Sequence, residues 1–314
     1  MILLLLFAGW GCHEAVPVIH ISKFKGDKPA AITFTFDDTN QSGIDVIAPL
    51  FDERDWRASF FINCTDDYEG WKAMALRGHE IGNHSCSHLD LSGIHDNATL
   101  AYEINFNYDQ ITENIGIPPI TFVHPYDKTN SDVDRVAFER HLFTRIIPKG
   151  FCKPMPYGYF LQAIIEIDTA IATNDWLVLT GHGMGDGCCE ASYDAFVKTL
   201  DYVKLNEKKI WVDTFKNVAF YKIERENAVL TQDNDGNATH LSLRVNLDIH
   251  LPYAVPWVPL TIVVPLNDNF SKKVRIINAG DQRDIPFAQK EGALRFDILP
   301  NEDVVIIFYN GETA

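Results

Sequence analysis

Basic residues are scarce in this sequence. Its 314 residues include 27 Lys and Arg but 43 Asp and Glu, which gives a net charge of −16. A chain with this excess of acid repels phosphate backbones and anionic lipid headgroups, which argues against nucleic acid and anionic membrane surfaces as partners. The sequence also contains no internal repeat and no low-complexity stretch. Its hydrophobic fraction of 46% is that of a globular protein with a real core.

Long apolar runs are missing as well. The N-terminal run Ile2–Ala8 is too short to span a bilayer as a helix, so we expect no transmembrane span beyond a leader. This run resembles the apolar region of a signal peptide, and small residues precede Cys12. We therefore expect residues 1–12 to be a signal or lipoprotein leader. The chain is then secreted or held at the cell envelope, in the second case by a lipid anchor at Cys12. A buried N-terminal strand is the alternative.

Cysteine is too rare for a disulfide scaffold. The chain has six cysteines, whereas small secreted domains that depend on disulfides are far denser in this residue. In an exported chain some cysteines can still pair, and we expect Cys152 to pair with Cys188 or Cys189. The neighbours Cys188 and Cys189 seldom reach disulfide geometry with each other.

Short apolar strands alternate with amphipathic helices between about residues 30 and 222. Over 97–116, for example, apolar side chains recur at helical spacing, with Asp96 or Asn97 as the N-cap and Gly116 at the end. Such alternation predicts a largely parallel sheet or an α/β barrel. We expect strands at 31–36, 58–63, 79–83, 120–124, 143–147, 177–181 and 210–213.

After Glu224 the pattern changes to strands alone. Strand-like segments at 241–251, 260–266, 272–279 and 303–310 are separated by turn residues, and no helical period is present. The sequence therefore predicts two domains, an α/β unit over residues 25–223 and a small all-β sandwich over residues 226–314.

Two adjacent carboxylates end the first predicted strand. Asp37 and Asp38 come directly after the apolar segment 31–36, and no Lys or Arg lies between Lys28 and Arg54. Two like charges at the end of a buried strand repel each other and lose hydration. The pair therefore needs a compensating positive group.

Polar side chains follow three further strands. His84 and His88 are four residues apart, Tyr126 follows the next strand, and His182 lies among glycines after another. The carboxyl ends of parallel strands meet at one rim of a barrel, where active sites lie. Two imidazoles and one carboxylate of the Asp pair form a site for a divalent cation, which also neutralises the pair. Three protein ligands leave room for water and substrate, as in a catalytic site.

The segments TFDD (35–38), HSCSH (84–88) and HPY (124–126), with the apolar strand before His182, resemble successive motifs of the polysaccharide deacetylase family (NodB homology, carbohydrate esterase family 4). The resemblance covers about two-thirds of the chain. It implies a distorted (β/α) barrel of the NodB type. It also implies removal of N- or O-acetyl groups from an acetylated glycan, with a divalent cation, usually zinc, as cofactor.

The same resemblance implies a role for six residues. The site then consists of a general base, a general acid, a backbone N–H donor to the oxyanion and three metal ligands. Asp37 is then the general base, His182 is the general acid, and Tyr126 supplies the backbone N–H. The metal ligands are Asp38, His84 and His88.

Two motifs depart from the family pattern. The third motif begins with Val123, where the family has an Arg that orients the base. The fourth motif is not evident, and Asp175 and Asp168 are the candidates for its aspartate. These departures leave two alternatives. One is a hydrolase of another C–N bond, such as a cyclic imide or amide, on the same scaffold. The other is a catalytically inactive carbohydrate-binding protein. Retention of both aspartates and all three motif histidines favours an enzyme, because a binding module needs no base.

Overall fold

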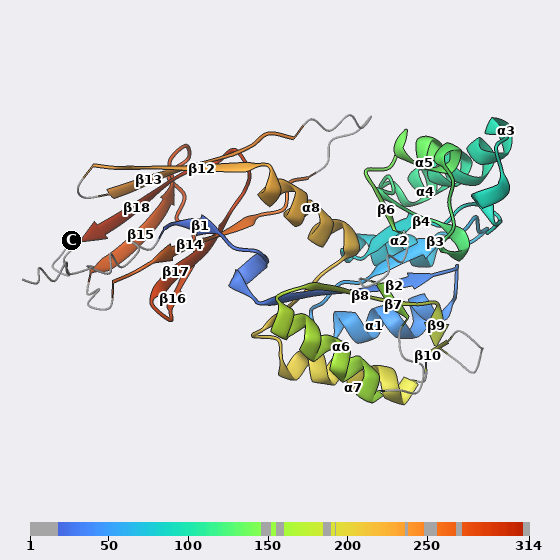
Figure 1. Ribbon diagram of the computed structural model, residues 1–314, viewed down its shortest axis with the longest axis horizontal. Coiled ribbons are helices and arrows are strands. Elements are labelled where there is room, and N and C mark those ends of the chain that lie inside the picture. Colours follow the sequence, from blue (N-terminus) through green and yellow to red (C-terminus); the bar gives the residue numbers. More distant parts are fainter. Residues whose placement is uncertain are drawn as a thin grey trace, which may run out of the picture.

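The computed structural model describes residues 18–145, 152–154, 160–184, 190–191, 193–235, 238–247, 256–267 and 272–309. It is elongated, with an α/β unit at one end and a β-sandwich at the other, and helix α8 (Phe215–Glu226) lies between them (Figure 1). No helix in these ranges is long and apolar enough to cross a membrane.

The α/β unit is built on a sheet of eight parallel strands. Seven follow one another in the order β6-β5-β4-β3-β2-β8-β7, and β11 pairs with the start of β2. Each strand expected from the sequence in this region is present. β7 is an addition to this sheet, and the short parallel pair of β9 (Gly183–Met184) and β10 (Glu190–Ala191) is a further addition beside it. The strands are β2 (Ala30–Asp37), β3 (Ser59–Ile62), β4 (Glu80–Asn83), β5 (Thr121–Val123), β6 (Phe143–Arg145), β7 (Cys152–Pro154), β8 (Trp176–Gly181) and β11 (Ile210–Val212).

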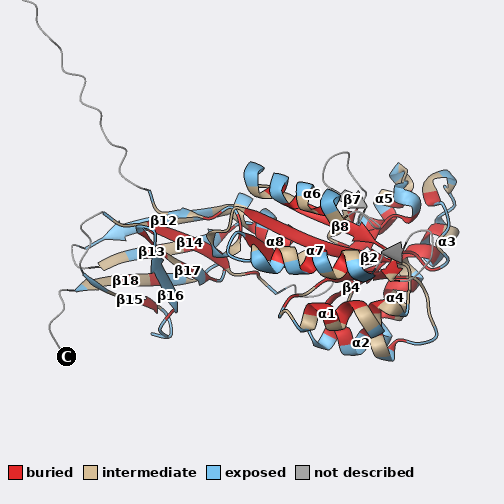
Figure 2. Cartoon of the chain, turned by 90° about the horizontal axis from the view of Figure 1, so that it is seen from below, coloured by how far each residue is buried: buried red, intermediate tan, exposed pale blue. Residues whose placement is uncertain are grey.

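Helices pack around this sheet, so its strands are buried while the outer helix faces are exposed (Figure 2). The expected helix over 97–116 is present: the Asp96 side chain accepts the Thr99 N–H at its start, and Gly116 ends it with a left-handed φ of 86°. The helices are η2 (Gly43–Ile47) with α1 (Ala48–Asp52), α2 (Glu69–Leu76), α3 (Asn97–Leu100) continued by η4 (Ala101–Phe106) and α4 (Asn107–Ile115), α5 (Ser131–Phe138), α6 (Phe160–Thr173) and α7 (Tyr193–Leu205).

Strand β2 has two different faces. Phe34 and Phe36 pack in the hydrophobic core beneath the helices, whereas Thr35 faces the barrel interior and donates to the Thr180 hydroxyl at 3.1 Å. Because side chains alternate along a strand, Asp37 lies on the same interior face as Thr35. The period-2 pattern of the sequence thus turns the first aspartate of the pair inward.

Two four-stranded antiparallel sheets form the β-sandwich, in the orders β1-β14-β17-β16 and β12-β13-β18-β15. The fold class expected from the sequence is therefore confirmed: a distorted (β/α) barrel followed by an all-β sandwich. The strands are β1 (His20–Ile21), β12 (Ala228–Asn234), β13 (Ala238–Val245), β14 (Leu260–Pro265), β15 (Lys273–Asn278), β16 (Phe287–Lys290), β17 (Ala293–Ile298) and β18 (Asp303–Tyr309).

The N-terminal end of the described chain belongs to the sandwich. β1 pairs with β14, and the Asp27 carboxylate accepts a hydrogen bond from Arg295 Nε on β17 at 2.7 Å. On α8, the buried Tyr221 hydroxyl donates to Ser22 O at 3.0 Å. One hydrophobic core continues from α8 into the sandwich. The domain boundaries drawn from the sequence stay a prediction.

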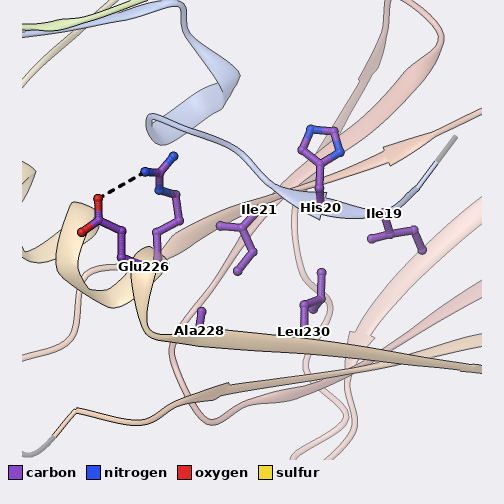
Figure 3. A pocket seen from close by; sticks show the side chains of 7 residues that line it. Ile19, His20, Ile21, Glu226, Ala228 and Leu230 are labelled. Carbon is purple, nitrogen blue, oxygen red and sulfur yellow. Dashed lines mark ion pairs between the residues drawn. The ribbon is translucent and has the colours of Figure 1, made fainter.

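A hollow of about 390 Å³ lies between β1, the end of α8 and the start of β12 (Figure 3). Its walls include Ile21 and Leu230. The ion pair of Arg225 and Glu226 lies at its side, with 3.7 Å between Nη2 and Oε1. None of the residues expected to carry chemistry lines this hollow.

Candidate active site

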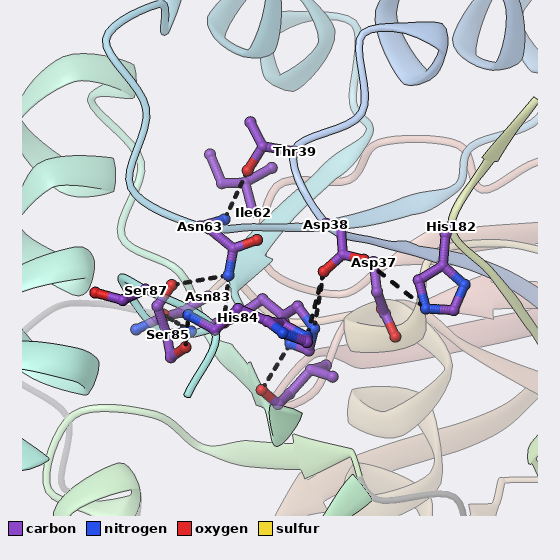
Figure 4. Close-up of polar contacts among 12 residues, drawn as sticks. Asp37, Asp38, Thr39, Ile62, Asn63, Asn83, His84, Ser85, Ser87 and His182 are labelled. Atoms are coloured by element: carbon purple, nitrogen blue, oxygen red, sulfur yellow. Dashed lines mark hydrogen bonds and ion pairs between the residues drawn. The ribbon is translucent and has the colours of Figure 1, made fainter. Parts of the chain in front are cut away.

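Three residues with metal-binding side chains meet at the carboxyl ends of neighbouring strands. Asp38 follows β2, and His84 lies in the loop after β4 (Figure 4). His88 lies in the same loop, four residues later. Asp38 Oδ1 is 3.6 Å from His84 Nε2 and 3.4 Å from His88 Nε2. One ligand atom from each of the three lies within 4.8 Å of the others. The structure thus brings together the three residues expected to bind metal.

The donor set fits a divalent cation. His84 donates from Nδ1 to Val123 O at 2.9 Å, which leaves the lone pair of Nε2 directed at the cluster. Burial lowers the pKa of His84 and so favours its neutral, ligating form. Two imidazole nitrogens and a carboxylate oxygen are a ligand set that zinc takes in catalytic sites. Asp38, His84 and His88 would therefore hold such an ion.

Four residues around the cluster have left-handed backbones. The φ angles are 61° at Asp38, 64° at Ser85, 55° at His88 and 59° at Tyr126. Residues other than glycine seldom adopt this conformation, at a cost of about 1–3 kcal/mol each. Such strain persists where surrounding contacts enforce it, and its concentration here marks a functional site.

Buried amides hold the loop that carries the two histidines. Asn83 Oδ1 accepts the Ser85 N–H at 3.0 Å, and Asn107 Nδ2 donates to Ser85 O at 3.0 Å. Further along, Ser87 N–H donates to the Glu103 carboxylate at 2.8 Å. These contacts satisfy the polar groups of a buried irregular segment, which would otherwise be costly.

A disulfide joins Cys64 and Cys86, with their Cα atoms 4.5 Å apart. This pair was not expected from the sequence. The expected pair was Cys152 with Cys188 or Cys189, and the latter two lie outside the described residues. Cys64 and Cys86 follow the neighbouring strands β3 and β4, so the parallel pairing of these strands could have indicated it. Cys86 lies between the two ligand histidines, and its sulfur is bonded rather than available to a metal.

The first aspartate of the pair forms a buried ion pair with Arg145. Arg145 Nη2 donates to Asp37 Oδ2, and the side chains are 1% and 9% exposed, respectively. Arg145 Nη1 also donates to Thr180 Oγ1 at 3.1 Å. Asp37 Oδ1 is buried and accepts no hydrogen bond from the described residues. One carboxylate oxygen is therefore fixed and the other is available.

Arg145 supplies the positive charge that the third motif lacks. Val123 occupies the position of the family's Arg, and Arg145 on β6 is its direct register partner on the adjacent strand. The guanidinium thus comes from the next strand rather than from the motif. The sequence held one indication: a charged residue inside the apolar segment 143–147 needs a buried partner of opposite charge.

His182 follows β8 on the far side of Asp38 from His84 (Figure 4). Its Nε2 is 3.9 Å from Asp38 Oδ2, and its side chain is 37% exposed. The two candidates for the fourth motif have partners elsewhere. Asp168 accepts a hydrogen bond from the Tyr202 hydroxyl at 2.6 Å, and Asp175 lies 3.7 Å from Lys23 Nζ.

Tyr126 lies in η5 (Pro125–Asp127), directly after β5. Its side chain is exposed, and its ring centroid is 4.7 Å from that of His88. The residue is therefore at the rim of the cluster. Its role as an oxyanion donor stays a prediction.

A (β/α) barrel that carries a His₂–carboxylate cluster at one rim is typical of metal-dependent hydrolases. Residues 25–141 match the model of the polysaccharide deacetylase family, which confirms the resemblance drawn from the motifs. The match includes Asp37, Asp38, His84, His88 and Tyr126.

Individual relatives are distant. A gellan lyase of Bacillus sp. is 21% identical over 308 residues, an alignment that covers 86% of this chain and 12% of that protein, so the chain spans about an eighth of its length. The peptidoglycan deacetylase PdaC of Bacillus subtilis has a TM-score of 0.47 at 20% identity, covering 62% of this chain and 93% of that one. A family 4 carbohydrate esterase from Streptomyces lividans, solved with acetate, has a TM-score of 0.46 at 16% identity, covering 58% and 91%.

Proposed function

We propose that this chain is a metal-dependent hydrolase that removes acetyl groups from a carbohydrate polymer or oligosaccharide. The observation that carries the proposal is the juxtaposition of two groups at one rim. These are the Asp38–His84–His88 cluster and the Asp37 carboxylate, which Arg145 holds in the barrel interior. A ligand set and a positioned base are the two things that hydrolytic attack on an acetyl group requires.

A divalent cation, with zinc as the first choice for this ligand set, polarises the acetyl carbonyl and acidifies water when bound. The chain's own residues then accept and donate the protons. Arg145 neutralises Asp37 and fixes its Oδ2, so that the buried Oδ1 takes a proton from the attacking water. The carboxylate of Asp38 is committed to the cluster and serves as ligand rather than base.

His182 is the proposed general acid. It lies beside Asp38 at 3.9 Å and is partly exposed, which suits a group that must reach a leaving group on a bulky glycan. Its protonated ring donates to the leaving amine or alkoxide as the tetrahedral intermediate collapses. The backbone N–H of Tyr126 is the proposed donor to the oxyanion of that intermediate.

The missing Arg of the third motif motivated the alternative of a cyclic imide or amide hydrolase. The Arg145–Asp37 pair removes that motive, because the base has its guanidinium partner from another strand. The deacetylase proposal is therefore favoured over this alternative. Retention of both aspartates and all three motif histidines favours it over an inactive binding protein.

We further propose that the protein works outside the cytoplasm. The Cys64–Cys86 disulfide supports this, since such bonds persist in oxidising compartments. The leader at residues 1–12 and the lipid anchor at Cys12 are parts of the same proposal. Cell fractionation, together with the mass of the mature N-terminal peptide, tests both.

Acetate release tests the function directly. The purified chain is incubated with N-acetylated and O-acetylated oligosaccharides, before and after removal of metal by a chelator and after addition of Zn²⁺. We expect acetate from at least one substrate, loss after chelation and recovery with Zn²⁺. Hydrolysis of cyclic imides in place of acetate release would support the first alternative, and glycan binding without turnover the second.

A further inference from the structure

The turn formed by residues 39–42 contacts both sides of the site. It follows the Asp pair directly and consists of Thr39, Asn40, Gln41 and Ser42. None of these residues has a part in the function proposed above. Two of them reach in opposite directions, one toward the histidine ligands and one toward the segment after His182.

The first contact runs toward the metal ligands. The Thr39 hydroxyl oxygen accepts the Asn63 backbone N–H at 2.9 Å (Figure 4). The Asn63 side-chain amide in turn donates to His84 O at 2.7 Å and to Ser85 O at 3.1 Å. Thr39 is the residue after Asp38, so this chain of hydrogen bonds fixes the distance between the Asp38 carboxylate and the His84 ring.

The second contact runs toward the proposed acid. The Met184 N–H donates to the Ser42 hydroxyl at 2.8 Å, and that hydroxyl donates to Asn40 Oδ1 at 2.7 Å. The Asn40 amide also occupies the space that a side chain on Gly183 would need, since a Cβ there would lie 2.4 Å from Asn40 Nδ2. Gly183 and Met184 directly follow His182. The turn therefore holds His182 from its C-terminal side.

We infer that the turn 39–42 is a brace that sets the distance between the metal ligands and His182. Thr39 and Ser42 are its two positioning residues. The inference rests on the proposed function and assigns the two residues to different steps of it. Thr39 acts on metal affinity through Asn63, whereas Ser42 acts on protonation of the leaving group through the backbone that carries His182.

The experiment compares Thr39→Val and Ser42→Ala with the parent chain in three measurements. Zn²⁺ affinity of the metal-free protein is measured by competition with a chromophoric chelator. kcat and KM are measured at saturating Zn²⁺ with the best acetylated oligosaccharide. The same constants are measured with 4-nitrophenyl acetate, whose leaving group departs as a stable anion and needs no proton from an acid.

Ser42→Ala is expected to lower kcat on the oligosaccharide roughly 10²-fold, the usual cost of a misplaced catalytic group. Its KM and Zn²⁺ affinity stay unchanged, and its activity on 4-nitrophenyl acetate falls far less. Thr39→Val is expected to weaken Zn²⁺ binding about 10–100-fold, as removal of a group that orients a ligand does. At saturating Zn²⁺ it keeps the parent ratio of the two activities. Ser42→Thr and Thr39→Ser retain the hydroxyls and should restore the parent values.

Gly183→Ala is a second, independent variant of the Ser42 side of the brace. Its new methyl group displaces Asn40 and should reproduce the selective loss on the oligosaccharide. Ser92→Ala is the matched control, because among the described residues the Ser92 hydroxyl bonds only to Asp90, two residues earlier, at 2.6 Å. It is expected to change none of the three measurements.

Equal losses on both substrates in Ser42→Ala, or identical profiles for Ser42→Ala and Thr39→Val, would overturn the inference. Failure of the proposed function looks different. In that case the parent chain releases no acetate from any sugar, while the Zn²⁺ affinities still report whether Thr39 positions the ligands.

Discussion

Removal of the Arg145 guanidinium tests most directly how Asp37 is held. The two side chains are 1% and 9% exposed, so both charges are out of water. Arg145→Met keeps much of the side-chain length and leaves the Asp37 carboxylate buried without a counter-charge. Breaking one partner of such a pair costs about 3–5 kcal/mol. This is a large share of the roughly 5–15 kcal/mol by which a domain is stable.

The assay is urea unfolding of the metal-free protein, followed by circular dichroism. Because a lone buried charge is the source of the cost, removing the second charge should recover much of it. We therefore expect Asp37→Asn/Arg145→Met to be more stable than either single variant. Arg135→Met is the matched control: Arg135 and Glu139 are 48% and 50% exposed, and such a pair contributes about 0.3–0.5 kcal/mol.

The register of the sheet provides a rescue. Val123 and Arg145 are opposite each other on β5 and β6, so Val123→Arg/Arg145→Val moves the guanidinium across one strand pair. We expect this double variant to regain stability and acetate release relative to Arg145→Val alone. An Arg145→Met variant within about 0.5 kcal/mol of the parent chain, or purely additive single effects, would refute the reasoning.

Three further predictions concern other parts of the molecule. Asp37→Asn should keep Zn²⁺ affinity and lose roughly 10²–10⁴ in kcat, whereas Asp38→Asn should weaken Zn²⁺ binding; the reverse outcome would exchange their roles. Burial raises the pKa of Glu224 from 4.5 to about 7, so the folded state keeps the neutral carboxyl group up to a higher pH than the unfolded chain does. The stability that this difference provides is fully present below pH 4.5 and is lost as the pH rises through about 7. The free energy of unfolding of Glu224→Gln, measured by urea unfolding, should therefore rise relative to that of the parent chain by about 3 kcal/mol from about pH 4 to about pH 8. A difference between the two chains that does not depend on pH would contradict this. Deletion of residues 226–314 should lower the thermal midpoint and cause aggregation, since α8 shares its core with the sandwich; a soluble barrel that still binds Zn²⁺ would show that the two parts fold separately.

The positions of the strands, and of the polar residues that follow them, were predictable from the sequence, because they depend on the spacing of apolar residues within each segment. The alternation of β2 places Phe34 and Phe36 in one core and Asp37 on the opposite face, as the pattern requires. The convergence of Asp38, His84 and His88 could also be predicted, since parallel strands end at one rim. These features need only the sequence of each segment and the parallel direction of the sheet.

The partners that join distant segments were not predictable in the same way. Arg145 is 108 residues from Asp37, and only the register of β5 with β6 shows that it replaces the missing Arg. The Cys64–Cys86 disulfide likewise depends on which strands are neighbours. Register is decided by packing across the sheet, and single-segment patterns carry little of that information.

Strand β1 has a consequence for how the chain is made. Ile21 of β1 pairs with Ile262 of β14, about 240 residues later in the chain. At a synthesis rate of about 5–20 residues per second, the partner strand emerges roughly 12–50 s after β1 does. The barrel strands can assemble in that interval, but β1 lacks its partner β14 until residue 262 has left the ribosome. The sandwich is thus completed late, when β1 docks onto a strand that is made about 240 residues after it.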